Sequence, residues 1–215
     1  MFKLDRNTLV ADFVWDAAAQ RYKWVDNGRY LSREAMLSLT GKAIEGSKRE
    51  LRAIANQLIE NEISLKDWQK ATAQQLKILH LQQALLGRGG VDAMKSADYL
   101  AIGRNLKSEY EYLRNFAKDI NDGNLTQSQF LARLDMYAEK SRSSGLMMAE
   151  AGHKEQGYQY MQRFLAPANN CQSCIEYAFK GIQPIGFLPL PTFDCFCRAN
   201  CRCSVMYFRK PDGSD

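Results

Sequence analysis

The six cysteines of this 215-residue chain all lie between residues 171 and 203, and residues 1–170 contain none. They form two groups separated by 20 residues: Cys171-x-x-Cys174, and then Cys195-Phe-Cys197-Arg-Ala-Asn-Cys201-Arg-Cys203. Two groups of thiols joined by a segment of loop length can fold back onto one tetrahedral Zn²⁺ ion. Because this region has little else from which to build a core, we expect the cluster to decide whether the C-terminal segment folds.

Four thiolates complete a zinc site, so two of the six cysteines are in excess. Cys171 and Cys174 are the first pair expected at the ion, because a gap of two residues lets both sulfurs face it. Four cysteines remain as candidates for the other two positions. A six-thiolate cluster that holds two metal ions is one alternative, and disulfides in place of the metal are another.

The Cys-x-x-Cys motif also occurs in thioredoxin-like redox proteins. There it opens a helix within a β-α-β unit, whereas Cys171 follows a helical region and precedes a Pro-rich loop. The N-terminus lacks the pattern of a secretory signal, and no apolar run has the length of a membrane span. We therefore expect synthesis in the cytoplasm, where clustered thiols are more often metal ligands than disulfides.

The sequence from residue 32 to about residue 165 is predicted to be helical, because apolar residues recur at intervals of three and four positions. Glycines and polar turn residues interrupt this pattern at residues 61–64, 86–90, 121–124 and 143–145. Ser64 and Thr126 begin capping-box patterns, which mark the starts of helices. This region therefore predicts a bundle of about four long helices.

Shorter segments flank the helical region. Residues 21–31 place aromatic and β-branched side chains on both sides of Asp26-Asn27-Gly28, which is typical of a β-hairpin. After Pro167, proline, aromatic residues and cysteine replace glutamine, glutamate, lysine and leucine. We therefore predict a mainly α-helical protein in three parts: an N-terminal arm with a β-hairpin (residues 1–31), a helical bundle (32–166) and a small Cys-rich zinc-knuckle domain (167–215).

The remaining residues favour no enzymatic activity. The two histidines, His80 and His153, lie outside the cysteine cluster, and the simplest interpretation of His80 is a packing or surface residue of a helix. The sequence has no Gly-x-Ser-x-Gly, no phosphate-binding glycine loop and no His-Glu-x-x-His. We accordingly expect no catalytic residues.

The charge balance gives weak support for nucleic-acid binding. The chain has a formal net charge of +5, but the region from Cys171 onward holds only five Lys/Arg against four Asp/Glu. Four cations of this region lie near one another in the sequence, with aromatic residues among them, and are candidates for phosphate contacts: Arg198, Arg202, Arg209 and Lys210. A solvated rim around a structural zinc site is the simpler interpretation of these residues.

The order of these segments resembles the phage Mu F-like minor head proteins, also called phage head morphogenesis proteins. The resemblance rests on a long helical region, Cys-x-x-Cys, a Gly/Pro loop of about 20 residues, Asn-Cys-Arg-Cys and a short strand. It implies that the zinc ligands are Cys171, Cys174, Cys201 and Cys203. The family's ending His-Pro-x-Cys-Arg-Cys reads Arg198-Ala199-Asn200-Cys201-Arg202-Cys203 here. If the family's histidine contributes to the site, Cys197 or Cys195 takes its place in this chain.

This resemblance implies a non-enzymatic bacteriophage protein of the virion or its assembly, in the minor head or the head–tail (portal/neck) region. Portal and/or major capsid proteins would be its partners, a homo-oligomer is expected in the particle, and no membrane is involved. A zinc-dependent DNA-binding or regulatory module is the alternative function. A redox protein that uses Cys171 and Cys174 is a third hypothesis.

Overall fold

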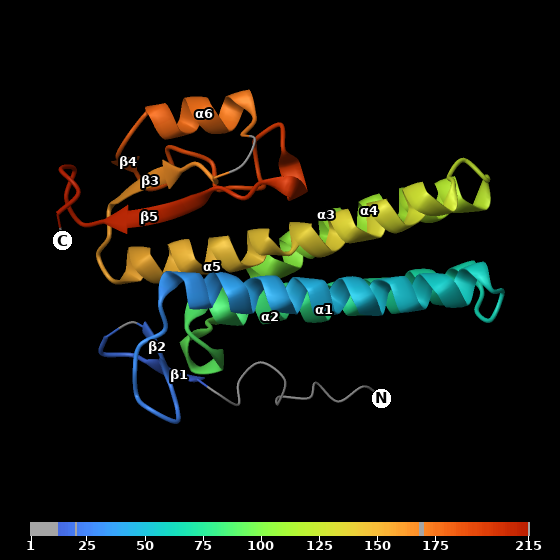
Figure 1. The fold of residues 1–215 in the computed structure, drawn as a ribbon, viewed down its shortest axis with the longest axis horizontal. Coiled ribbons are helices and arrows are strands. Elements are labelled where there is room, and N and C mark those ends of the chain that lie inside the picture. Colours follow the sequence, from blue (N-terminus) through green and yellow to red (C-terminus); the bar gives the residue numbers. More distant parts are fainter. Residues whose placement is uncertain (1–12, 20, 168–169, 215) are drawn as a thin grey trace.

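The computed structural model describes residues 13–19, 21–167 and 170–214, and its main body is a bundle of long helices (Figure 1). Helix α4 is followed by α5 almost without interruption, because only Ser141 separates them. The predicted mainly α-helical fold is therefore confirmed. The helices of the bundle are α1 (Arg33–Ile59), α2 (Leu65–Arg88), α3 (Ser96–Asn121), α4 (Gln127–Lys140) and α5 (Arg142–Glu155), with a 3₁₀ turn η1 (Val91–Ala93) before α3.

The helix starts follow the capping residues of the sequence. Ser64 is the N-cap of α2 and accepts a hydrogen bond from the Asp67 amide, and Thr126 caps α4 in a complete capping box with Gln129. One expected break is displaced: the chain leaves α4 at Ser141, so residues 143–145 lie in the first turn of α5. Ser141 is fully buried and its hydroxyl donates to the Ala138 carbonyl, which ends the preceding helix without a loop.

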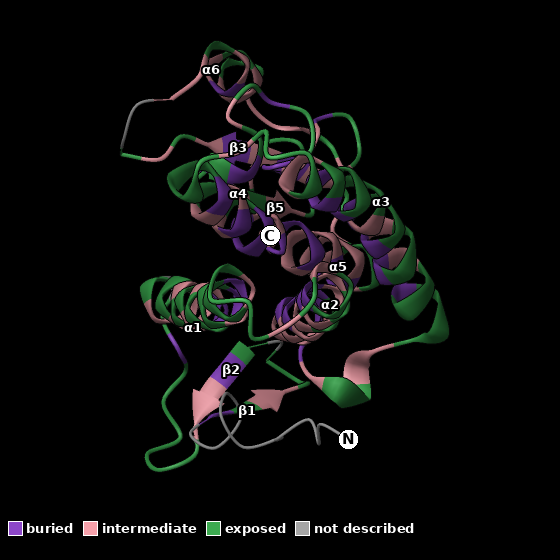
Figure 2. Ribbon diagram, turned by 90° about the vertical axis from the view of Figure 1, so that its right-hand side faces the viewer, coloured by how far each residue is buried: buried purple, intermediate pink, exposed green. Residues whose placement is uncertain are grey.

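Aromatic side chains fill one end of the bundle core. The ring centroids of Trp68 on α2, Phe116 on α3 and Phe130 on α4 lie 5.5 Å from one another, and all three pairs meet edge to face. Trp68 and Phe130 each stand four residues after a helix N-cap, so equivalent positions of two helices meet in one cluster. Figure 2 shows buried residues gathered where α2, α4 and α5 face one another.

Helices α2 and α5 approach closely at two glycines. A Cβ atom added to Gly87 on α2 would overlap the backbone carbonyl of Gly145 on α5, and one added to Gly145 would lie 3.1 Å from the Gln83 carbonyl. Neither position has room for a larger side chain without movement of a backbone. These glycines therefore set the distance between the two helices.

We expect Gly87→Ala to destabilise the protein by about 1–3 kcal/mol, because the added methyl group forces α2 and α5 apart. Gly41→Ala is the matched control, since this glycine also lies within a helix but has no atom within 4 Å of the added Cβ. That control is expected to stabilise the protein by about 0.5–1 kcal/mol. Urea denaturation monitored by circular dichroism measures both, and equal effects of the two substitutions would contradict the close packing.

The N-terminal hairpin packs against the end of α2. Its strands are β1 (Phe13–Asp16) and β2 (Arg21–Trp24), and residues 1–12 of the predicted arm lie outside the described part of the chain. The predicted turn at residues 26–28 is spanned by a single β-bridge between Lys23 and Tyr30, whereas the strand that pairs with β2 is β1, which precedes it in the chain. The Tyr22 hydroxyl donates to the carbonyls of Leu85 and Leu86, which fixes the hairpin to the last turn of α2.

The C-terminal segment forms a small three-stranded sheet with one helix (Figure 1). Its elements are β3 (Tyr160–Phe164), α6 (Gln172–Phe179), β4 (Gln183–Pro184), a 3₁₀ turn η2 (Arg198–Asn200) and β5 (Ser204–Phe208), and the antiparallel sheet has the order β4-β3-β5. The expectation that residues 160–164 are helical is wrong, because they pair with β5. The bounds of the predicted parts stay a prediction, and β3 lies in the part assigned to the bundle. From here on, residues 160–214 are called the C-terminal module.

Candidate metal centre

Four cysteines of the C-terminal module lie together. The Sγ atoms of Cys174, Cys195, Cys197 and Cys201 all lie within 4.8 Å of one another. Cys174 is placed by the first turn of α6, and the other three come from the chain around η2. All six cysteines of the chain are free thiols, so the cluster can bind a metal ion.

The distances within this group suit a tetrahedral thiolate site. Cys174 Sγ lies 3.4 Å from Cys197 Sγ and 3.6 Å from Cys201 Sγ, and Cys195 Sγ lies 3.9 Å from Cys197 Sγ. A regular tetrahedron with Zn–S bonds of about 2.3 Å has S···S edges of about 3.8 Å. The donor set and its spacing therefore fit Zn²⁺ without a large movement of the chain.

Two cysteines of the set implied by the family resemblance lie beside this group. Cys171 is half-buried, with its Sγ 3.0 Å from Cys197 Sγ, and Cys203 donates to the Asn170 side-chain carbonyl at 3.6 Å. The two alternates, Cys195 and Cys197, are in the group of four. The choice of Cys171 and Cys203 as ligands stays a prediction, and Cys174 and Cys201 belong to both sets.

The metal-free thiols differ in acidity. Burial raises the pKa of Cys174 far above its usual range, and it also raises the pKa of Cys197, to about 12. Burial acts in the same direction on Cys171, but hydrogen bonds from Cys197 and Ser173 outweigh it and bring its pKa to about 6. A bound divalent cation reverses the effect of burial, because a coordinating thiol loses its proton.

Arg163 on β3 belongs to the centre and was not predicted from the sequence. Its side chain is 1% exposed, and its Nη2 donates to the Sγ atoms of Cys174 (3.3 Å) and Cys201 (3.2 Å). Its Nη1 donates to the Pro189 carbonyl at 2.9 Å. Side chains alternate between the two faces of a strand, so residues 161 and 163 of β3 share one face. This spacing could have indicated that Arg163 is buried beside Met161.

A buried carboxylate joins the module to the bundle. Glu139 on α4 is 4% exposed and forms ion pairs with Lys48 on α1, Arg142 on α5 and Arg202, at 2.8, 3.3 and 2.8 Å. Burial raises the pKa of Glu139, but the hydrogen bond from Lys48 and the charges of Arg142 and Arg202 outweigh it and hold that pKa below 4.5. Because Arg202 stands between Cys201 and Cys203, the ion pair ties the cysteine region to α4.

The cations suggested for phosphate contacts are spread over the module. Arg202 is engaged by Glu139, and the guanidinium of Arg209 lies 4.7 Å from the centre of the Tyr158 ring. Arg198 and Lys210 are exposed, in η2 and in the turn after β5. The four residues thus lie before and after β5, and their assignment to phosphate contacts stays a prediction.

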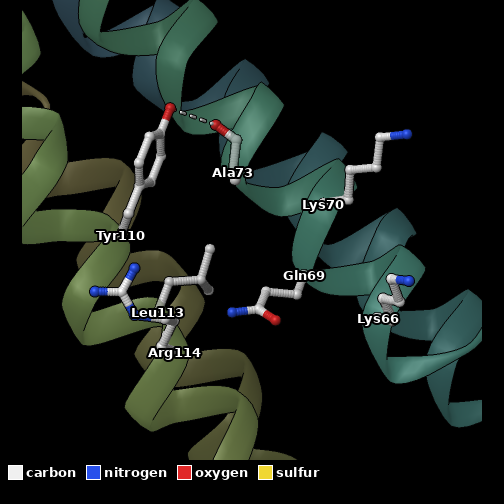
Figure 3. Close-up of a pocket in the computed structure, with 7 residues that line it drawn as sticks. All are labelled: Lys66, Gln69, Lys70, Ala73, Tyr110, Leu113 and Arg114. Atoms are coloured by element: carbon white, nitrogen blue, oxygen red, sulfur yellow. Dashed lines mark hydrogen bonds between the residues drawn. The ribbon is translucent and has the colours of Figure 1, made fainter.

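A different basic surface lies on the bundle, in a groove of 310 Å³ between α2 and α3. In Figure 3, Gln69 and Leu113 point toward each other across this groove, whereas the charged ends of Lys66, Lys70 and Arg114 point away from it on its two sides. Every charged residue that lines the groove is a cation. No local sequence pattern marks this groove, because its cations come from two helices and lie about 45 residues apart in the chain.

The bundle interior holds titratable side chains as well. His80 is fully buried and its Nδ1 lies 2.8 Å from the Ser144 hydroxyl, as expected for a packing residue. Burial lowers the pKa of His80 to about 4, with a further contribution from Lys140. Burial raises the pKa of Glu109 on α3 to about 7, although the charge of Lys140 opposes this shift. The protonated carboxyl of Glu109 is therefore favoured in the folded state.

This gives a pH prediction for Glu109→Gln. The folded pKa lies above the ordinary value of 4.5, so the stability contributed by the neutral carboxyl is present below pH 4.5 and is lost as the pH rises through about 7. We expect Glu109→Gln to match the wild type at pH 4 and to exceed its stability by up to about 3 kcal/mol at pH 8. Urea unfolding at both pH values tests this, with the exposed Glu111→Gln as the control. A constant difference across pH would contradict it.

Comparison of the chain with protein-family models, with curated proteins and with solved structures found no match. Among the described residues, no helix combines the length and the apolar composition that a membrane crossing requires.

Proposed function

We propose that this chain is a non-enzymatic structural or assembly protein of a phage particle, in the minor head or the head–tail region. In this proposal a Zn²⁺ ion bound by Cys174, Cys195, Cys197 and Cys201 closes the C-terminal module. The zinc centre in this proposal rests on the group of four thiols at tetrahedral spacing. The ion pair between Arg202 and Glu139 connects this part of the chain to the bundle.

The set of four cysteines favours a structural role for this centre over a catalytic one. Four protein thiolates fill a tetrahedral shell, whereas catalytic zinc sites keep one position open for water or substrate. The ion supplies a cross-link among α6, the loop after it and the segment that precedes β5. Two hydrogen-bonded contacts also stabilise the module. Arg163 donates to two of the sulfurs, and Lys140 on α4 donates to the carbonyl of Thr192, in the loop before Cys195, at 2.8 Å.

The place in a phage particle is supported by the order of segments that resembles the minor head proteins. Exposed aromatic residues of the C-terminal module support it further. Phe179 and Phe196 are 85% and 80% exposed, and Phe187 is 61% exposed. Large apolar side chains that remain in water are typical of surfaces that bind another protein. Portal or major capsid subunits are the proposed partners.

The test is quantitative mass spectrometry of this chain in purified particles, scaled to the major capsid protein, together with zinc content. A copy number the size of a ring, with one zinc per chain, is the expected result. A copy number near that of the capsid protein would place the chain in the shell instead of the neck. Absence of the chain from the particles would contradict the proposal that it is a component of the virion.

A nucleic-acid-binding protein is the second candidate, and the basic groove between α2 and α3 favours it. Phosphate contacts release counterions, so affinity for duplex DNA should fall steeply as salt rises. The variant Lys66→Glu/Lys70→Glu should weaken binding of a DNA duplex far more than Arg198→Glu/Lys210→Glu, which changes the net charge equally. Equal losses would mean that net charge alone attracts DNA, and no binding by the wild type would exclude this candidate.

A further inference from the structure

Arg163 brings a permanent positive charge into the C-terminal module. A guanidinium group stays protonated in proteins, and burial of a charge without an opposite charge is costly. Among the described residues, no carboxylate forms an ion pair with Arg163, whose guanidinium meets the sulfurs, the Pro189 carbonyl and, at 5.2 Å, the centre of the Tyr177 ring. The sulfurs beside it are therefore its source of negative charge.

We infer that Arg163 makes closure of the C-terminal module depend on the bound metal; this rests on the proposed zinc centre. Neutral thiols are weak hydrogen-bond acceptors and cannot offset the charge of a buried guanidinium. Four thiolates and one Zn²⁺ carry a net charge of −2, because each ligand has released its proton to solvent. The N–H groups of Arg163 then donate to charged sulfurs, and the anionic zinc–thiolate group and the guanidinium stabilise each other.

The position of Arg163 connects this charge to the fold of the module. It lies within β3, the central strand of the sheet, opposite Val205 of β5. Its Nη2 contacts one sulfur from α6 and one from the segment before β5, while its Nη1 contacts the loop at Pro189. When these segments close over β3 they remove the guanidinium from water, so closure without metal leaves its charge with the Pro189 carbonyl, the Tyr177 ring and neutral thiols but no anion.

Substitution of Arg163 by methionine distinguishes coupling to the metal from a simple packing role. Arg163→Met keeps an unbranched side chain, which reaches about as far as the arginine Nε, and removes the guanidinium with its charge. If Arg163 only packs, this change weakens the module with and without metal. If Arg163 couples closure to the metal, the change weakens zinc binding but stabilises the closed metal-free form.

The experiment uses the full chain as wild type, Arg163→Met, Arg163→Lys and the control Arg209→Met, which removes a guanidinium of the same module from above the Tyr158 ring. Zinc affinity is measured by competition with a chromophoric chelator. Amide hydrogen exchange in β3 and β5 is measured with Zn²⁺ and after removal of metal. We expect Arg163→Met to lower zinc affinity 10- to 100-fold and to slow exchange in the metal-free module.

The lysine variant should lose less affinity than the methionine variant, because it keeps the charge but not the forked geometry. The Arg209→Met control should bind zinc as the wild type does. Faster metal-free exchange in Arg163→Met, or a zinc affinity equal to that of the wild type, would overturn the inference while the zinc centre stands. A wild-type chain that takes up no Zn²⁺ would overturn the proposed centre and this inference together.

Discussion

Cys174→Ser is expected to abolish stoichiometric zinc binding and to unfold the C-terminal module while the helical bundle stays folded. Cys174 is fully buried, and its sulfur contacts two other cysteines and Arg163. Structural zinc sites contribute an apparent free energy of about 10–16 kcal/mol in peptides at pH 7, which exceeds what a small sheet with little apolar core supplies. The change should therefore melt the pairing of β3 with β5.

Cys171→Ser is the matched control for this prediction. Its sulfur lies beside Cys197 but outside the group of four, so the variant should keep one zinc per chain. Zinc content, far-ultraviolet circular dichroism and amide exchange along the chain measure both variants. If Cys171→Ser loses the metal and Cys174→Ser keeps it, the assignment of ligands is wrong. If Cys174→Ser loses most of the helical signal, the module and the bundle do not fold separately.

Glu139→Ala is expected to destabilise the protein by about 1.5–3 kcal/mol, because it removes a buried carboxylate that accepts charge-assisted hydrogen bonds, although Lys48 keeps its second partner Glu45. Lys48, Arg142 and Arg202 come from α1, α5 and the cysteine region, so the loss should loosen the contact between module and bundle. Asp135→Ala is the control. Asp135 on α4 forms an ion pair with the half-exposed Arg52 on α1, the same two helices that Glu139 and Lys48 join. Removal of the Asp135 carboxylate should destabilise the protein by less than about 1 kcal/mol.

The same carboxylate predicts a loss of stability in acid. The pKa of Glu139 in the folded protein is below 4.5, so its contribution is present above the unfolded value and is lost as the pH falls through the folded pKa. Urea unfolding from pH 7 down to pH 3 should show a steeper decline for the wild type than for Glu139→Gln. Identical slopes for the two proteins would contradict the role of Glu139 at this contact.

The helical part of the fold was accessible from the sequence because its signals are local. N-caps at Ser64 and Thr126 and the αL glycine Gly89 act within one turn of the helices that they start or end. Where the prediction failed, tertiary contacts were responsible. Residues 160–164 are separated from the end of α5 by four residues, and pairing with β4 and with β5, about 40 residues later, makes them a strand.

The sequence determined that the chain is mainly α-helical and that a cluster of thiols lies at its C-terminal end, since both follow from spacing along the chain. Only the tertiary structure decided which four thiols meet, because the 20-residue loop after Cys174 sets how Cys195 and Cys197 return to it. It also placed Arg163 against the sulfurs and Glu139 against Arg202. Such buried charge contacts join residues tens of positions apart, and no local pattern of polar or apolar residues encodes their partners.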